Sequence, residues 1–142
     1  MRLDAMASYL GIQDCPYGDR EITGIQYDSR KVEPGNLFVC IKGLKTDGHT
    51  YIPQALKAGA KAILAQDEVA VMQPSDIAVL QYPDTRLGLA KLSALWYGFP
   101  SKEFRLWGVT GTNGKTTTTY LMKYVWEQEN LKTGLVGTVQ NM

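Results

Sequence analysis

A glycine-rich loop in the last third of the chain carries the residues best suited to phosphate chemistry. It reads Gly108-Val109-Thr110-Gly111-Thr112-Asn113-Gly114-Lys115-Thr116-Thr117 and lies between an apolar stretch and an expected helix. Glycines allow a tight turn whose backbone N–H groups point at phosphate oxygens, and a helix start adds the positive end of its dipole. The Lys115 ammonium can reach the β- and γ-phosphates of a nucleotide, and the Thr116 hydroxyl can bind Mg²⁺.

This loop meets the general phosphate-loop pattern only in part. The pattern G-x-x-x-x-G-K-[ST] requires glycine five residues before Gly114, where this chain has Val109. The alternative is a glycine-rich turn with an incidental Gly-Lys-Thr. The strand–loop–helix context and the run of threonines at 116–119 favour the phosphate loop.

Two further segments follow apolar strands in the first half of the chain, Tyr27-Asp28-Ser29 and residues 43–49. Ligands of open α/β sheets bind outside the carboxyl ends of the strands, so we expect both segments to lie at a ligand site. The Asp28-Ser29-Arg30 stretch could instead be a strand-end turn in which Arg30 pairs with Asp28. His49 is expected to be a helix-start residue.

Strands and helices must alternate to hold these segments. Hydrophobic periodicity and Gly/Pro breaks predict helices at residues 3–10, 51–58, 84–97 and 115–129, and strands at residues 22–27, 37–41, 62–65, 77–80, 104–109 and 134–138. This alternation indicates an α/β fold with a largely parallel sheet. The break at Gly98-Phe99-Pro100-Ser101 predicts a small N-terminal domain over 1–99 and the incomplete start of a P-loop domain over 100–142.

Composition limits the remaining possibilities. The 142 residues carry a formal net charge of +1, with 44% hydrophobic residues and no basic run, so we expect an ordinary core and no nucleic-acid partner. No apolar stretch approaches the length of a bilayer span or a signal-peptide core, so we expect a cytoplasmic protein without a membrane partner. With one histidine and cysteines only at 15 and 40, a zinc site is not expected. Cys40 reads as a small buried residue.

The glycine loop, read as Gly-Thr-Asn-Gly-Lys-Thr-Thr-Thr from Gly111, closely resembles the ATP loop of the Mur ligases, and folylpolyglutamate synthetases share a similar loop. Upstream, the chain also resembles the UDP-binding N-terminal domain of the third and fourth Mur ligases. The upstream motifs are Tyr27-Asp28-Ser29-Arg30, Pro34-Gly35-Asn36-Leu37-Phe38-Val39, Gly43 and Asp47-Gly48-His49. The Gly-Thr-Asn triplet and Gly137-Thr138-Val139 favour the third ligase of the family.

The resemblance implies an ATP-dependent amide-bond ligase of peptidoglycan synthesis. Such an enzyme adds the third amino acid, meso-diaminopimelate or lysine, to UDP-N-acetylmuramoyl-L-Ala-D-Glu through an acyl phosphate. ATP and Mg²⁺ are the implied cofactors, the UDP-N-acetylmuramoyl-dipeptide and a diamino acid are the implied partners, and a monomer is expected. Because the family's later domains are missing, the fragment alone should be inactive.

The same resemblance assigns roles to individual residues. It implies that Lys115 is catalytic, that Thr116 helps to bind the metal, and that the ATP phosphates contact Gly111, Thr112, Asn113, Gly114, Lys115, Thr116 and Thr117. It implies that the UDP end of the substrate contacts Tyr27, Ser29, Lys45 and Thr46.

Three alternatives stay open at this point. The chain could belong to the next ligase of the pathway, which adds D-Ala-D-Ala, or it could be a non-catalytic UDP-sugar-binding module. A generic P-loop NTPase is disfavoured because it leaves residues 28–30 without a role.

Overall fold

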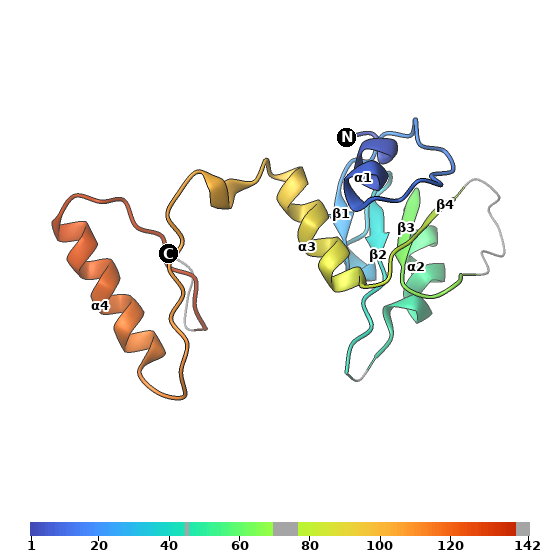
Figure 1. The fold of residues 1–142 in the computed structure, drawn as a ribbon. Helices are drawn as coiled ribbons and strands as arrows, with labels where there is room; N and C mark the ends of the chain where they lie inside the picture. Colours follow the sequence, from blue (N-terminus) through green and yellow to red (C-terminus); the bar gives the residue numbers. More distant parts are fainter. Residues whose placement is uncertain (45, 70–76, 139–142) are drawn as a thin grey trace. The chain divides into compact units, whose positions relative to one another are not determined.

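The computed structural model describes residues 1–44, 46–69 and 77–138, and the chain divides into two compact units, Met1–Pro100 and Ser101–Met142. The first unit is an α/β sandwich, and the second is built around one helix, α4 (Lys115–Gln128) (Figure 1). Within the described ranges, no helix is long and apolar enough to cross a bilayer.

The first unit contains a four-stranded sheet in which every strand is parallel to its neighbour. Its strands are β1 (Ile25–Gln26), β2 (Leu37–Val39), β3 (Ala62–Ala65) and β4 (Ala78–Gln81), in the spatial order β1-β2-β3-β4. The prediction of an α/β fold with a largely parallel sheet is therefore confirmed. Parallel pairing also brings the four carboxyl ends to one edge of the sheet.

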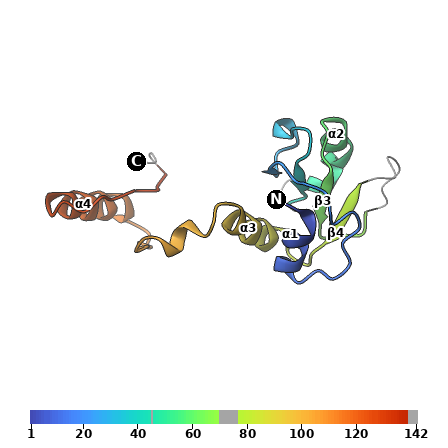
Figure 2. The same ribbon diagram turned by 90° about the horizontal axis from the view of Figure 1, so that it is seen from above.

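Alternating side chains of the strands build two cores, one on each face. On one face, Leu37 and Val39 pack with residues of α1 (Leu3–Leu10) and α3 (Thr85–Trp96). On the other face, Phe38 and Ile63 pack with residues of α2 (Ile52–Lys57). Figure 2 shows α1 and α3 on one side of the sheet and α2 on the other. Burial on both faces explains why β2 and β3 are continuous apolar runs.

The helix ends follow local chemistry that can be read in the sequence. Gly11 ends α1 in the left-handed region at φ 79°, and its N–H donates to carbonyls of the last turn. Asp84 begins α3, because its Oδ1 accepts hydrogen bonds from the backbone N–H groups of Arg86 and Leu87, both at 3.0 Å. The predicted helices 3–10 and 84–97 match these elements closely.

The predicted strand over 22–27 is wrong in extent, because only Ile25 and Gln26 pair in the sheet. The backbone N–H of Ile22 donates to the Met1 carbonyl at 2.8 Å, and that of Thr23 donates to the Gly35 carbonyl at 3.1 Å. These residues are therefore held by two other segments rather than by the ladder of the sheet. After β1 the chain enters a 3₁₀ helix, η1 (Ser29–Lys31), so Ser29 begins a helical turn just beyond the strand.

In the second unit, the strands predicted over 104–109 and 134–138 are not formed within the described residues, although Val136 takes part in an isolated β-bridge. The named elements there are α4 and the 3₁₀ helix η3 (Pro100–Lys102), which begins at the boundary. A strand needs a paired neighbour to satisfy its backbone groups. Residues 104–108 are exposed instead, and Trp107 lies against Trp126 of α4 with ring centroids 5.9 Å apart. Phe104 and Leu106 stay exposed, so the contact of Trp107 with α4 does not bury the apolar pattern at 104–109.

Candidate functional site

A cavity of about 470 Å³ opens where the chain leaves β1 at the carboxyl edge of the sheet. Its volume lies within the usual range for small-molecule sites. Three segments supply its walls: the end of β1, η1, and the junction of η2 (Gly48–Tyr51) with α2. The residues that line it are Tyr27, Asp28, Ser29, Arg30, Tyr51 and Gln54.

Asp28 shapes the η1 side of this cavity. Its Oδ1 accepts from the backbone N–H of Arg30 at 3.1 Å and so caps the 3₁₀ turn. The Arg30 guanidinium also donates to both Asp28 oxygens, at 2.9 Å from Nε and 2.7 Å from Nη2. These hydrogen bonds, from the side chain and then from the backbone, lower the pKa of Asp28 to about 2. The strand-end pairing considered as an alternative is therefore present, and the paired residues line the cavity as well.

Ser29 connects η1 to α2. Its side chain is buried, and its Oγ donates to Oε1 of Gln54 at 2.9 Å. The hydroxyl proton is therefore already used, which leaves the lone pairs of Ser29 and the amide N–H groups of Gln54 to face a ligand. A ligand that offers both a donor and an acceptor, as an amide-like ring does, fits this pair.

The rest of the lining combines aromatic faces with positive charge. Tyr27 and Tyr51 are 65% and 41% exposed, so both present rings that a planar group could stack against. Among the described residues, nothing accepts a hydrogen bond from Nη1 of Arg30, which leaves that donor free for an anionic oxygen. The cavity is suited to binding a ring joined to a phosphate, and it contains no obvious nucleophile–base pair.

The turn after β2 is tied closed at its base. Lys42 and Asp47 form an antiparallel bridge, the N–H of Gly43 donates to the Thr46 carbonyl at 2.9 Å, and that of Gly48 donates to the Ile41 carbonyl at 2.9 Å. Thr46 is exposed on this turn and does not line the cavity. The other residue expected here for UDP, Lys45, lies outside the described residues.

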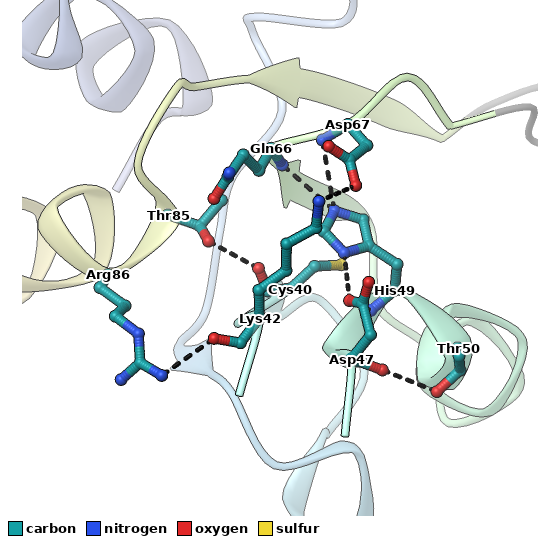
Figure 3. A network of polar contacts seen from close by, with 9 residues as sticks. All are labelled: Cys40, Lys42, Asp47, His49, Thr50, Gln66, Asp67, Thr85 and Arg86. Carbon is teal, nitrogen blue, oxygen red and sulfur yellow. Dashed lines mark hydrogen bonds and ion pairs between the residues drawn. The ribbon is translucent and has the colours of Figure 1, made fainter. Parts of the chain in front are cut away.

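A polar network joins this turn to the ends of β2 and β3, as Figure 3 shows. The Lys42 ammonium lies 2.5 Å from an oxygen of Asp67, and this hydrogen bond is the main cause of the raised pKa of Lys42. His49 contacts Asp47 through Nδ1 and the backbone N–H groups of Gln66 and Asp67 through Nε2. The pKa of Asp47 is lowered, mainly by the backbone N–H of His49 and then by its ring.

The start of α3 contacts the same edge of the sheet. Buried Thr85 donates through Oγ1 to the Cys40 carbonyl at 2.7 Å, and Arg86 donates through Nη2 to the Lys42 carbonyl at 2.9 Å. Cys40 is fully buried, as expected from the sequence, and burial raises the pKa of its thiol to about 12.

Asp47, His49 and Asp67 also lie close enough together to be considered as ligands of a metal ion, with their ligand atoms within 4.8 Å of one another. However, both ring nitrogens of His49 already form hydrogen bonds, and the Asp67 carboxylate forms an ion pair with the Lys42 ammonium. The arrangement therefore fits a hydrogen-bonded network better than a cation site.

In the second unit, the glycine loop leads directly into α4 through glycines in backbone conformations that other residues rarely adopt. Gly111 and Gly114 have φ values of 150° and 77°, and no side chain caps the start of α4 at Gly114. The Lys115 ammonium donates to the loop's own carbonyls, at 2.6 Å to Gly111 and 3.4 Å to Thr112, and forms no ion pair within the described residues. The residues expected to contact ATP, from Gly111 to Thr117, are all exposed.

Sequence reasoning placed Tyr27 and Ser29 near a ligand, and the structure brings both to one cavity. The prediction from sequence did not include Tyr51 and Gln54, which reach the cavity from η2 and α2. No local signal marks Gln54, because its role depends on how α2 packs beside η1. Arg30 was considered only as a partner of Asp28.

Comparison with known proteins gives two family matches along the chain. Residues 21–97 match the model described as "Mur ligase family, catalytic domain", and residues 109–142 match the "Mur ligase middle domain". The first match covers every residue that lines the cavity, and the second begins at the glycine loop.

Individual relatives agree with these matches. The chain is 52% identical over 128 residues to the UDP-N-acetylmuramoyl-L-alanyl-D-glutamate--2,6-diaminopimelate ligase of Syntrophomonas wolfei subsp. wolfei, which covers 90% of this chain and 26% of that protein. The chain thus spans about a quarter of the length of this curated relative.

Solved structures show the same fold. A structure of a UDP-N-acetylmuramoyl-L-alanyl-D-glutamate--2,6-diaminopimelate ligase superposes with a TM-score of 0.71 and 24% identity, over 100% of this chain and 29% of that one. The MurF ligase of Thermotoga maritima, solved in complex with ADP, superposes with a TM-score of 0.54 and 29% identity, over 78% of this chain and 24% of that one. With the first family model alone matching residues 21–97 of 142, the chain belongs to the Mur ligase family.

Proposed function

We propose that the chain is the substrate-binding and early ATP-binding part of an ATP-dependent amide-bond ligase. This ligase adds the third amino acid to UDP-N-acetylmuramoyl-L-Ala-D-Glu in peptidoglycan synthesis. In this proposal residues 1–99 bind the UDP end of the substrate, and residues 100–142 begin the domain that binds ATP.

The observation that carries the proposal is the cavity at the carboxyl end of β1. It lies where open α/β sheets bind their ligands. Its tyrosines offer faces for the uracil ring, Ser29 and Gln54 offer an acceptor and a donor for the ring's polar edge, and Arg30 offers a donor for the diphosphate. The cavity thus offers a suitable contact for both the uracil ring and the diphosphate of a uridine diphosphate.

The glycine loop supports ATP as the second ligand. The left-handed backbone at Gly114 has open space above it, and the uncapped start of α4 leaves N–H donors for phosphate oxygens. We propose that residues Gly111 to Thr117 cradle the phosphates and that Lys115 exchanges its bonds to the loop carbonyls for phosphate oxygens. The exposed hydroxyl of Thr116 fits a role as one ligand of Mg²⁺, which would neutralise phosphate charge.

The chemistry explains why two anionic ligands must be held together. A carboxylate is a poor electrophile, and activation by ATP as an acyl phosphate makes it open to attack by an amine. The contribution of this chain's residues is to bind and orient the nucleotides, and to offset charge with Arg30 and Lys115. Because the reaction consumes ATP, we place the enzyme in the cytoplasm, and we keep the monomer that the family resemblance implies as part of the proposal.

The name of the relative in Syntrophomonas wolfei favours diaminopimelate over lysine as the incoming amino acid. The likeness to the MurF ligase of Thermotoga maritima supports the next ligase of the pathway as an alternative assignment. That alternative is the weaker one, because the identity is 29% to this ligase and 52% to the Syntrophomonas wolfei relative.

The test is phosphate release by the full-length protein that contains this chain, with ATP, Mg²⁺ and UDP-N-acetylmuramoyl-L-Ala-D-Glu. We expect turnover that requires diaminopimelate, with little or none on lysine. Turnover only with D-Ala-D-Ala and a UDP-tripeptide would assign the chain to the next ligase. ATP hydrolysis that is indifferent to the UDP substrate would overturn the proposal.

A further inference from the structure

The imidazole of His49 links two loops at the carboxyl edge of the sheet (Figure 3). Its Nδ1 lies 2.5 Å from Oδ1 of Asp47, and since a carboxylate accepts, Nδ1 carries the proton. Its Nε2 lies 3.2 Å and 3.4 Å from the backbone nitrogens of Gln66 and Asp67, both of which can only donate. The contacts therefore select the neutral Nδ1–H tautomer.

Asp47 carries this link into η2. Its Oδ1 accepts from the backbone N–H of His49 at 2.9 Å, and its carbonyl accepts from Oγ1 of Thr50 at 2.7 Å, so Asp47 caps the 3₁₀ helix. The next element, α2, has six residues, and its N-cap Tyr51 makes no side-chain cap. So short a helix is not stable by itself, and its first turn depends on η2.

Two residues of this segment form one wall of the cavity. Tyr51 ends η2, and Gln54 lies in the first turn of α2 with its amide bonded to Ser29 at 2.9 Å. Whatever fixes the start of η2 thus also fixes the aromatic face and the amide that a ligand would meet. The Lys42–Asp67 ion pair reinforces the end of β3, to which His49 is bonded.

We propose that His49 is a positioning residue for nucleotide binding. As the Nδ1–H tautomer it ties η2 and the start of α2 to the end of β3, and it thereby holds Tyr51 and Gln54 in place for a UDP group. This inference rests on the proposed function, because it assumes that the cavity binds UDP.

The first measurement is the tautomer itself. His49 is the only histidine of the chain, so a long-range ¹H–¹⁵N correlation spectrum of the 142-residue protein at a pH where the ring is neutral reports on this residue alone. We expect a protonated Nδ1 and an unprotonated Nε2. A protonated Nε2 would overturn the inference whatever UDP does.

The second measurement is UDP affinity, by calorimetric titration of the same chain. His49→Gln keeps an acceptor near the Nε2 position, whereas His49→Leu removes it. We expect His49→Leu to weaken UDP binding by about tenfold, the equivalent of one well-placed hydrogen bond, and His49→Gln to stay within about threefold of wild type. Leu10→Ala, at the end of α1 and in the core on the α1 face of the sheet, controls for a general loss of stability.

The outcomes separate the two proposals. Equal affinity of wild type and His49→Leu would overturn the positioning role alone, as would an equal loss of affinity in Leu10→Ala. Failure of the wild-type chain to bind UDP would overturn the assignment of the cavity and, with it, this inference.

Discussion

Each of the two proposed sites contains one cationic side chain, Arg30 in the cavity lining and Lys115 in the glycine loop 111–117. Each already donates to oxygens of its own segment: Lys115 to loop carbonyls and Arg30 to the Asp28 carboxylate. These bonds keep the cations in place, and an anionic ligand can compete for them because both side chains are exposed. Residue-scale tests can therefore separate the role of each cation from its contribution to stability.

Substitution of Lys115 should remove catalysis and leave the fold intact. In the full-length enzyme we expect Lys115→Ala to lower kcat by about a hundredfold or more, the usual cost of losing a preorganised charge in phosphoryl transfer. Lys123→Ala is the matched control, because Lys123 lies on the same helix and pairs with Glu127. Steady-state kinetics at saturating ATP measure the effect. Near-normal kcat in Lys115→Ala would contradict the assigned role.

Asp28 should titrate far below an ordinary aspartate. Its pKa of about 2 lies below the usual value, so the ion pair with Arg30 favours the fold at neutral pH, and this contribution is lost as the pH falls through about 2. A ¹³C NMR titration of the carboxyl should give this low midpoint, and Arg30→Met should raise it towards about 3.9. Arg86→Met, which removes a bond to a carbonyl instead, should leave it unchanged. A wild-type midpoint near 3.9 would show that the pair does not form.

At the scale of elements, the turn between β2 and η2 sets the position of η2, whose last residue, Tyr51, lines the cavity. Gly48 starts η2 directly above the end of β2, where a Cβ would lie 2.5 Å from the Ile41 nitrogen and 2.9 Å from its oxygen. Both are backbone atoms, which cannot move aside as a flexible side chain can. The Gly48 N–H also closes the turn through its bond to the Ile41 carbonyl.

Gly48→Ala should therefore destabilise the first unit by about 1–3 kcal/mol, the typical cost of forcing extra volume into a packed site. Leu44→Ala is the control, because Leu44 lies in the same turn and is fully exposed, and it should change stability by less than about 0.5 kcal/mol. Urea unfolding followed by circular dichroism compares the two. Equal stability of Gly48→Ala and wild type would mean that the backbone of the turn shifts away from Ile41 at no cost, which contradicts this prediction.

Elements whose signals are local could be predicted from the sequence. The buried run at Leu37–Val39 and the glycine stop at Gly11 appear in the structure where the pattern placed them. The strand over 22–27 was overextended because the bonds of Ile22 and Thr23 go to Met1 and Gly35, which local sequence does not reveal. Gln54 was missed for the same reason: its partner Ser29 lies 25 residues away.

At the scale of the whole molecule, the two proposed sites lie in separate units, and the chain covers only 26% of the length of the Syntrophomonas wolfei relative. The N-terminal unit has two cores, one on each face of its sheet, and the described part of the second unit leaves Leu121, Tyr124 and Val125 of α4 exposed. An apolar helix face of this kind is typical of a surface that packs against other structure. We therefore expect this chain to bind the UDP group by itself, and we expect catalysis only from the full-length protein.

The 142-residue chain alone should show no ligase activity. Phosphate release with ATP, the UDP-dipeptide and diaminopimelate should stay at the background of a reaction without enzyme, while the full-length protein turns over. Turnover by the chain near that of the full-length protein would mean that the remaining domains are not needed for catalysis.

The most direct test of the central claim is a map of UDP binding on the ¹⁵N-labelled 142-residue chain. Amide chemical shifts are recorded while UDP is added, with inorganic phosphate as the control ligand. If the cavity at the end of β1 is the UDP site, the largest changes fall on Tyr27 to Arg30, Tyr51 and Gln54, and phosphate alone does not reproduce them. Changes confined to the region after Gly108, or no changes around the cavity at saturating UDP, would contradict the account and return residues 28–30 to the role of a structural turn.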